Sequence, residues 1–266
     1  MPQLKLGGAN MSYSDDGEGE PLVLLHGWIG SGALWDLTAP WLSEFFRVIV
    51  PDLPGHGDSG IPAGFSFSLD GFSSFIDELR AALELPTINL VGHSMGGCIA
   101  VHYAARHAEV VGRLVLIDTP ARAGALNWQA KLPGIDKLLG LLYPLWGPRI
   151  VTRLIKSSVR HPEELPDDFL ERAVAQACKL HKEALVGTTR LIRALDLDAE
   201  IQEIEAPVLI MQGDHDPSVN PAGASSLRDT FKDAHLQMVL DCGHCPNYEY
   251  PELVVELVAG FISPDV

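Results

Sequence analysis

The sequence predicts a mostly parallel, doubly wound α/β sheet of about eight strands that carries an inserted helical lid. Three observations predict it: short and continuously apolar runs, helical stretches that alternate with them, and one long interval that contains no such run. Continuously apolar strands are typical of a parallel sheet that helices cover on both faces. Alternation of these strands with helices predicts the doubly wound arrangement.

The elements follow in order along the chain. The opening segments 3–6 and 9–13, joined by Gly7 and Gly8, predict a hairpin on the edge of the sheet. Six apolar runs predict buried strands at residues 22–25, 48–50, 88–91, 114–117, 208–211 and 236–240. Between them, the sequence predicts helices at roughly 33–45, 68–85, 95–107, 182–196, 221–231 and 251–262.

One interval interrupts the alternation. No good strand lies between Asp118 and Pro207, and residues 120–181 instead contain helical pieces separated by prolines and rich in Leu, Trp and Tyr. A long insertion after the carboxyl end of a strand lies where open α/β sheets bind ligands. We therefore predict a core of residues 1–119 and 182–266, with a helical lid of residues 120–181 inserted after the sixth strand.

Composition excludes several classes of protein. No apolar run in the 266 residues approaches the length of a membrane span, and the N-terminus lacks the apolar core of a secretion signal. A net charge of −16 argues against a general nucleic-acid binder, and four cysteines do not suggest a disulfide scaffold. The expectation is a cytoplasmic enzyme with no membrane span and no nucleic-acid partner.

A sharp turn carries the strongest chemical signal. Gly92-His93-Ser94-Met95-Gly96 matches G-x-S-x-G between a predicted strand and a predicted helix, which is the context that a nucleophile elbow requires. Such a turn forces the serine into a strained backbone conformation, and a Cβ atom at 92 or 96 would collide with the neighbouring chain. The turn lifts the Ser94 hydroxyl above the sheet at the positive end of a helix.

Five motifs in this order resemble those of the α/β-hydrolase superfamily, and the resemblance covers nearly the whole chain. They are a His-Gly oxyanion loop, an Asp-x-x-Gly-x-Gly-x-Ser loop, the elbow, an acid turn and a histidine loop. In this sequence they lie at residues 24–28, 51–59, 92–97, 213–216 and 243–246. The resemblance implies a hydrolase of the serine carboxylesterase type.

A serine nucleophile needs a base and an orienting acid, which follow it in this fold in the order acid, then histidine. His244 is the predicted base because it follows the last strand in a glycine-rich loop, whereas His235 begins that strand. The resemblance places the acid at Asp216 rather than Asp214. Asp118 stays open as an alternative because some relatives use the end of that earlier strand.

Other histidines are predicted to have structural roles: His93 as a packed residue, and His26 as a brace for the oxyanion loop. The oxyanion hole needs two backbone N–H donors. One is the residue after the nucleophile, Met95, and the resemblance supplies the other as Trp28. No metal is predicted, because Cys242-x-x-Cys245 has no second pair and zinc takes four ligands. No cofactor is predicted, since no glycine-rich dinucleotide loop follows the first parallel strand.

A serine at the covalent position indicates acyl chemistry on esters, thioesters, lactones or some amides. Relatives that open epoxides or displace halide have a carboxylate there. The predicted function is hydrolysis of carboxylic esters through an acyl-enzyme intermediate. Three alternatives stay open: a methyl ester esterase for pimeloyl groups on acyl carrier protein, a lactone or carbon–carbon hydrolase, and a small-ligand receptor on the same fold.

The predicted lid has two distinctive surfaces. Its apolar residues predict a roof over an acyl or aryl group: Leu126, Trp128, Leu132, Ile135, Leu138, Leu139, Leu141, Leu142, Tyr143, Leu145 and Trp146. Residues 120–162 also carry seven basic side chains and one acidic one.

Four of these basic residues are spaced to share one helix face: Arg149, Arg153, Lys156 and Arg160. They predict either a solvated surface or a docking face for an anionic partner. Pimeloyl-acyl-carrier-protein methyl ester esterases, to which the chain is similar, use a basic lid in the second way.

Overall fold

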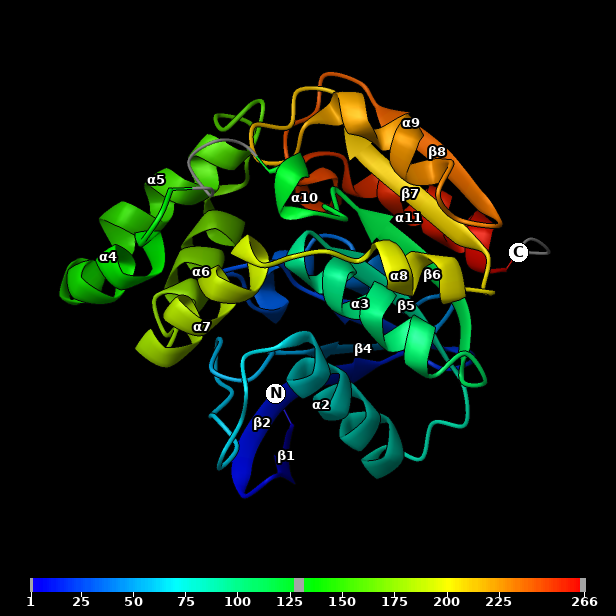
Figure 1. Cartoon of the computed structure of the whole chain (residues 1–266), viewed down its shortest axis with the longest axis horizontal. Helices are drawn as coiled ribbons and strands as arrows, with labels where there is room; N and C mark the ends of the chain where they lie inside the picture. Colours follow the sequence, from blue (N-terminus) through cyan, green and yellow to red (C-terminus); the bar gives the residue numbers. More distant parts are fainter. Residues whose placement is uncertain (1, 127–131, 264–266) are drawn as a thin grey trace.

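An eight-stranded sheet forms the centre of the protein in the computed structural model, which describes residues 2–126 and 132–263 (Figure 1). The strand order is β1-β2-β4-β3-β5-β6-β7-β8. β1 (Gln3–Leu6) and β2 (Ala9–Asp16) form the edge hairpin, and β2 pairs antiparallel with β4 (Arg47–Pro51). All other neighbours pair in parallel, through β3 (Pro21–Leu25), β5 (Ile88–His93), β6 (Val111–Ile117), β7 (Val208–Gly213) and β8 (Ala234–Val239). This arrangement confirms the predicted fold class.

Helices cover both faces of the sheet, which explains why its strands are continuously apolar. Val23 and Leu25 of β3 pack into one hydrophobic cluster with α2 (Leu69–Ala82) and α3 (Met95–Arg106). Leu22 and Leu24 of the same strand pack into a second cluster with α1 (Ala39–Leu42) and α11 (Pro251–Ile262). Because side chains alternate along a strand, each face needs its own apolar residues.

The chain leaves the sheet after β6 and forms a group of helices before it returns through α8 (Asp198–Glu203) to β7. Three of them, the lid helices, are α4 (Ile135–Leu142), α5 (Pro148–Ser158) and α6 (Asp167–Ala177). In Figure 1 they lie together with α7 (Lys182–Arg193) on one side of the sheet, and α7 packs against α4. The division of the chain at residue 181 stays a prediction.

Two predicted helices are shorter in the structure. Residues 33–45 form a 3₁₀ turn, η1 (Gly32–Trp35), followed by α1, because Pro40 has no N–H with which to continue a helix from residue 36. Residues 221–231 likewise divide into η5 (Pro221–Gly223) and α9 (Ala224–Arg228). Two short helices were not predicted, α8 and α10 (Pro246–Glu249). Within the described ranges, no helix is both long and apolar enough to cross a membrane.

Candidate active site

The turn between β5 and α3 holds Ser94 in an unusual backbone conformation, with φ 52° and ψ −116°. Positive φ is rare for residues other than glycine and marks local strain. A Cβ atom at Gly92 would lie 2.5 Å from the backbone of Gly97, and one at Gly96 would lie 2.3 Å from the carbonyl oxygen of Leu25. The predicted need for glycine at 92 and 96 is therefore confirmed.

Hydrogen bonds connect the three residues that the sequence selected for catalysis. His244 Nε2 lies 3.0 Å from Ser94 Oγ, and His244 Nδ1 lies 2.8 Å from Asp216 Oδ2. The other oxygen, Asp216 Oδ1, accepts the backbone N–H groups of Ser218 at 2.6 Å and Val219 at 3.0 Å. The serine is thus in contact with a base, and the base with a firmly held acid.

The electrostatic environment of Asp216 favours a negative charge. Burial of the side chain opposes ionisation, but the charge and hydrogen bond of His244 and the two backbone N–H groups lower the pKa of Asp216 below its usual value. A carboxylate at this point accepts a hydrogen bond from the Nδ1–H group of His244, which keeps its proton. The Nε2 atom is then free of a proton and can accept one from the Ser94 hydroxyl.

A second carboxyl group lies beneath the same histidine. Asp118, at the end of β6, is fully buried and has φ 46°. Its Oδ1 accepts the backbone N–H of Gly213 at 2.8 Å and the Gln212 side-chain amide at 2.7 Å, and Oδ2 has no hydrogen-bond partner. The same Gln212 amide donates to Asp216 Oδ2 at 3.1 Å. His244 is hydrogen-bonded to Asp216 and not to Asp118, the alternative acid.

The two acids differ in their ionisation. Burial and the neighbouring charge of Asp216 raise the pKa of Asp118 well above its usual value. The site therefore favours one charge on two carboxyl groups, with the proton on Asp118. Sequence reasoning missed the bridging residue Gln212. Its signal was a polar side chain directly after the apolar run 208–211, within the last residues of β7.

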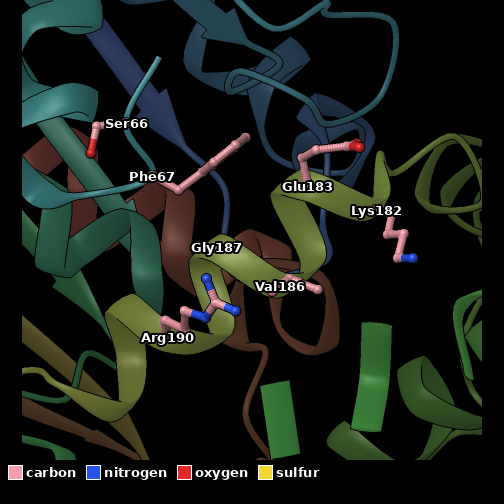
Figure 2. Close-up of a pocket in the computed structure, with 7 residues that line it drawn as sticks. All are labelled: Ser66, Phe67, Lys182, Glu183, Val186, Gly187 and Arg190. Carbon is pink, nitrogen blue, oxygen red and sulfur yellow. The ribbon is translucent and has the colours of Figure 1, made fainter. Parts of the chain in front are cut away.

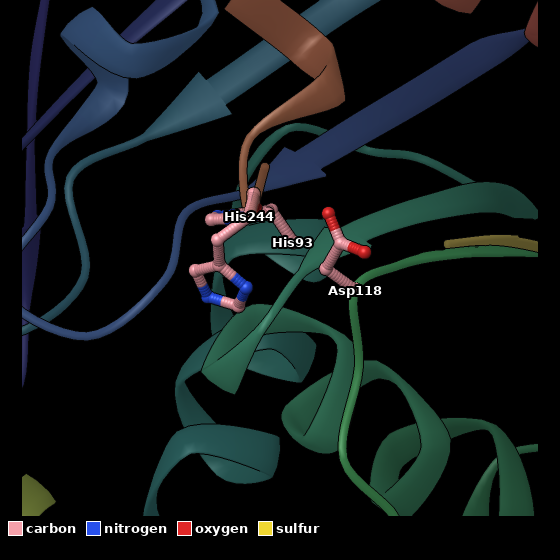
Figure 3. Close-up of side chains that lie close together, drawn as sticks. All are labelled: His93, Asp118 and His244. Atoms are coloured by element: carbon pink, nitrogen blue, oxygen red, sulfur yellow. The ribbon is translucent and has the colours of Figure 1, made fainter. Parts of the chain in front are cut away.

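His93 packs directly against the candidate base. Figure 3 shows His93, Asp118 and His244 converging from the end of β5, the end of β6 and the loop after β8. His93 Nε2 donates to the backbone carbonyl of His244 at 2.7 Å, and burial lowers the pKa of His93 to about 3. His93 is thus a packed residue, as the sequence predicted, and its neutral ring also holds the backbone of the histidine loop.

These three side chains offer nitrogen and oxygen atoms within 4.8 Å of one another, close enough to share a metal ion. Both ring nitrogens of His244 are already hydrogen-bonded, to Ser94 and Asp216, so an ion here would break these hydrogen bonds. The thiols of Cys242 and Cys245 are buried, and burial raises the pKa of each. Neutral thiols are poor metal ligands, and we assign no metal to either group.

A buried histidine braces the loop after β3. His26 Nδ1 donates to the carbonyl oxygen of Gly27 at 2.9 Å, and Nε2 accepts the backbone N–H of Leu53 at 3.0 Å. Burial lowers the pKa of His26, which keeps the ring neutral and fixes this donor–acceptor arrangement. The loop then turns tightly, with the Gly30 N–H donating to the Gly27 carbonyl. Trp28 lies inside this turn and lines the cavity above Ser94.

The two residues predicted to form the oxyanion hole, Trp28 and Met95, line this cavity together with Ser94. Met95 is the first residue of α3, so its N–H has no acceptor within the helix. The N-terminus of the helix also favours negative charge. Stabilisation of an oxyanion by these two amides stays a prediction.

A cavity of about 840 Å³ opens over the serine, between the carboxyl edge of the sheet and the lid helices. Most of its lining is apolar, and part of the predicted roof contributes to it: Leu126, Ile135 and Leu139. The remaining leucines of the roof are exposed, and this part of the prediction is wrong: Leu132, Leu138, Leu141, Leu142 and Leu145. Tyr143 and Trp146 instead donate hydrogen bonds to the backbone carbonyls of Leu180 and Ala177, and Trp128 lies outside the described residues.

The basic surface is smaller than the sequence predicted. The α5 helix ends two residues before Arg160, whose guanidinium donates to Asp241 at 3.0 Å, so the prediction of a helix face that includes Arg160 is wrong. Three of the four residues lie exposed on α5, and none forms an ion pair with another described residue: Arg149, Arg153 and Lys156. These three form the basic face of α5.

The sheet order, the elbow and the helical insertion define an α/β hydrolase. A family model for the alpha/beta hydrolase fold matches residues 20–251. The chain therefore belongs to this family, and the protein is a hydrolase. Family membership confirms the resemblance that its motifs indicated.

Several proteins of known function are similar to this chain, and their names include more than one kind of hydrolase. A pimeloyl-[acyl-carrier protein] methyl ester esterase from Nitrosospira multiformis is 27% identical, over 96% of this chain and 99% of the relative. A 2-hydroxy-6-oxo-2,4-heptadienoate hydrolase from Pseudomonas putida is 28% identical, over 97% and 95%. The solved structure of a thermophilic esterase from Thermogutta terrifontis shares the fold, with a TM-score of 0.86, 23% identity and 98% coverage of both chains.

Proposed function

We propose that the protein hydrolyses carboxylic esters through an acyl-enzyme intermediate, with Ser94 as nucleophile. The observation that carries the proposal is the continuous hydrogen-bonded series from Ser94 Oγ through His244 to Asp216, beneath an apolar cavity. A serine hydroxyl is a weak nucleophile at neutral pH, and this arrangement supplies the base that it needs.

In the first half of the reaction, Ser94 Oγ attacks the ester carbonyl carbon while His244 Nε2 takes the hydroxyl proton. The charge of Asp216 stabilises the imidazolium, and the amides of Trp28 and Met95 donate to the oxyanion. His244 then returns the proton to the departing alcohol. In the second half, His244 activates water, which hydrolyses the acyl-enzyme and releases the acid and the free serine.

The cavity supports an ester with an apolar acyl or aryl part, since most of its lining is apolar. The esterase name of the Nitrosospira relative agrees with ester chemistry. The name of the Pseudomonas relative keeps a lactone or carbon–carbon substrate as an alternative for the same serine.

The nucleophile is tested by Ser94→Ala. The variant should lose about 10⁴-fold or more of its activity on p-nitrophenyl acyl esters, as other serine triads do. It should keep the wild-type far-UV circular dichroism, because the missing hydroxyl is not part of the core. Mass spectrometry after phosphonate treatment should place the adduct on Ser94. An inert wild type would favour a small-ligand receptor, and an active alanine variant would reject the proposal.

A second candidate function is hydrolysis of a methyl ester carried on acyl carrier protein. The observation that favours it is the basic face of α5, which is exposed and faces no acidic partner among the described residues. The name of the Nitrosospira relative points to the same substrate.

A further inference from the structure

Arg193, the last residue of α7, is the only permanently charged residue in the described lining of the cavity above Ser94. Every other residue of that lining is apolar, a neutral polar residue or a histidine. The Arg193 side chain is 28% exposed, so it is only partly removed from water. A guanidinium group stays protonated in proteins, and the N–H groups that it buries need an acceptor.

The protein provides only some of these acceptors. Arg193 Nη1 donates to Asp136 Oδ1 at 3.3 Å, and Arg193 Nε is buried without a hydrogen-bond partner. The same Asp136 is held more closely by Arg190, whose Nε lies 2.7 Å from Asp136 Oδ2. The hydrogen bond of Arg190 lowers the pKa of Asp136, which keeps it ionised. One carboxylate thus faces two guanidinium groups, and the cluster keeps one excess positive charge.

The two arginines face different spaces, although they lie one turn apart on α7. Arg190 lines a separate groove of about 530 Å³ together with Lys182 and Phe67 (Figure 2). Arg193 lines the cavity that contains Ser94. Of the two arginines, Arg193 is therefore the one that a ligand in the Ser94 cavity can contact.

We propose that Arg193 binds an anionic group of the substrate, so that the preferred substrates are esters that also carry a carboxylate. This inference rests on the proposed ester hydrolysis. A carboxylate in the cavity would pair with the accessible part of the Arg193 side chain, which is 28% exposed, and balance the excess charge. Arg–carboxylate hydrogen bonds are among the strongest in proteins. Because Ser94 and Arg193 line one cavity, a single molecule contacts both when its ester and its carboxylate are separated by a chain of suitable length.

The test compares two ester series. Monomethyl esters of dicarboxylic acids, from glutaric to sebacic, are matched with methyl esters of monocarboxylic acids of the same length. The wild type should prefer the carboxylate ester at one or more chain lengths. Arg193→Met should lower kcat/KM for that ester by roughly 10- to 100-fold, mainly through KM, because it removes one charged hydrogen bond. The neutral esters should change by less than about threefold.

Arg190→Lys is the matched control. It changes the other arginine at Asp136 but keeps its positive charge, and Arg190 does not line the Ser94 cavity. The control should keep the wild-type preference for the carboxylate ester. Equal losses in the two variants, or no preference for any dicarboxylate ester in the wild type, would overturn the subsite while ester hydrolysis stands.

A binding measurement separates the subsite from catalysis. Ser94→Ala protein with Arg193 intact should bind the preferred monomethyl ester by calorimetry at least about tenfold more tightly than Ser94→Ala/Arg193→Met. If the wild type hydrolyses no ester, the proposed function fails, and this measurement still decides the subsite. Equal affinities in the two proteins would reject it.

Discussion

At the carboxyl edge of the sheet, Asp118 and Asp216 are buried carboxyl groups. By contrast, the side chains of Leu141, in α4, and Leu145, between α4 and α5, are 75% and 65% exposed. The carboxyl edge of the sheet encloses polar groups, most of which have hydrogen-bond partners. The outer surface of the lid instead exposes apolar side chains to solvent. It contains six of the nine large apolar side chains that are exposed in the described chain, all within residues 132–150.

This difference has an energetic consequence. Buried polar groups depend on one another, so a change at the edge leaves other groups unpaired and has a large effect. An exposed leucine has few neighbours to lose, so a change on the lid surface has a small effect on stability. The following predictions test this contrast, from the largest expected effect to the smallest.

Asp216→Asn and Asp118→Asn test the edge most directly. Asp216→Asn should lower kcat by roughly 10³- to 10⁴-fold, because His244 loses its charged acceptor. Asp118→Asn should cost less than about tenfold, since the neutral Asn resembles the protonated carboxyl group that burial favours. The kcat values of both variants on one ester decide between the acids, and a reversed ranking would assign Asp118 as the catalytic acid.

The raised pKa of Asp118 also predicts how stability depends on pH. In the folded protein Asp118 keeps its proton at pH values where the unfolded chain has lost it, so its contribution to stability falls as pH rises above about 4. Asp118→Asn removes this loss. Its free energy of unfolding relative to wild type should therefore rise between pH 4.5 and 7, by at most about 1.4 kcal/mol per pH unit. Urea unfolding at both pH values measures the difference, and a constant difference would contradict a protonated Asp118.

Local motifs explain why the sequence predicted the edge so well. The conformation of Ser94 and the clashes at Gly92 and Gly96 follow from a short segment and its immediate neighbours. His244 was predicted from its place after the last strand, and Asp216 from the resemblance to the family. Both are hydrogen-bonded in one series with Ser94. Gln212 was missed because its role depends on two carboxyl groups, from β6 and from the turn after β7, that become neighbours only in the folded sheet.

Tertiary contacts explain why the lid was predicted less well. Helical periodicity placed Arg160 on one face with Arg153, but Asp241, 81 residues away in the chain, binds the Arg160 side chain beyond the helix end. The apolar composition of the lid predicted that its leucines together cover the cavity. In the structure only some of these leucines line the cavity, and the others are exposed. Which face of a short helix is covered depends on its neighbours, and sequence alone does not show them.

The basic face of α5 should affect association and leave catalysis unchanged. Arg149→Glu/Arg153→Glu should raise KM for a methyl ester on acyl carrier protein by roughly tenfold at low salt, with little change for a small neutral ester. The effect should weaken as the Debye length falls from about 10 Å at 0.1 M salt to about 3 Å at 1 M. Lys5→Glu, on the edge strand β1, is the control for a charge reversal that lies outside α5. If the double variant changes KM for both substrates equally, the basic face of α5 is only a solvated surface and does not bind a carrier protein.

The smallest effect is expected on the exposed leucines. Leu141→Ser and Leu145→Ser should each change the free energy of unfolding by no more than about 0.5 kcal/mol, because most of each side chain already contacts solvent. Leu114→Ala, in the fully buried part of β6, should cost about 2–5 kcal/mol and provides the comparison. Urea unfolding of the three variants measures all the values under one condition. A loss above about 1.5 kcal/mol at Leu141 or Leu145 would show that these side chains are covered in solution, and the contrast between the edge and the lid surface would then fail.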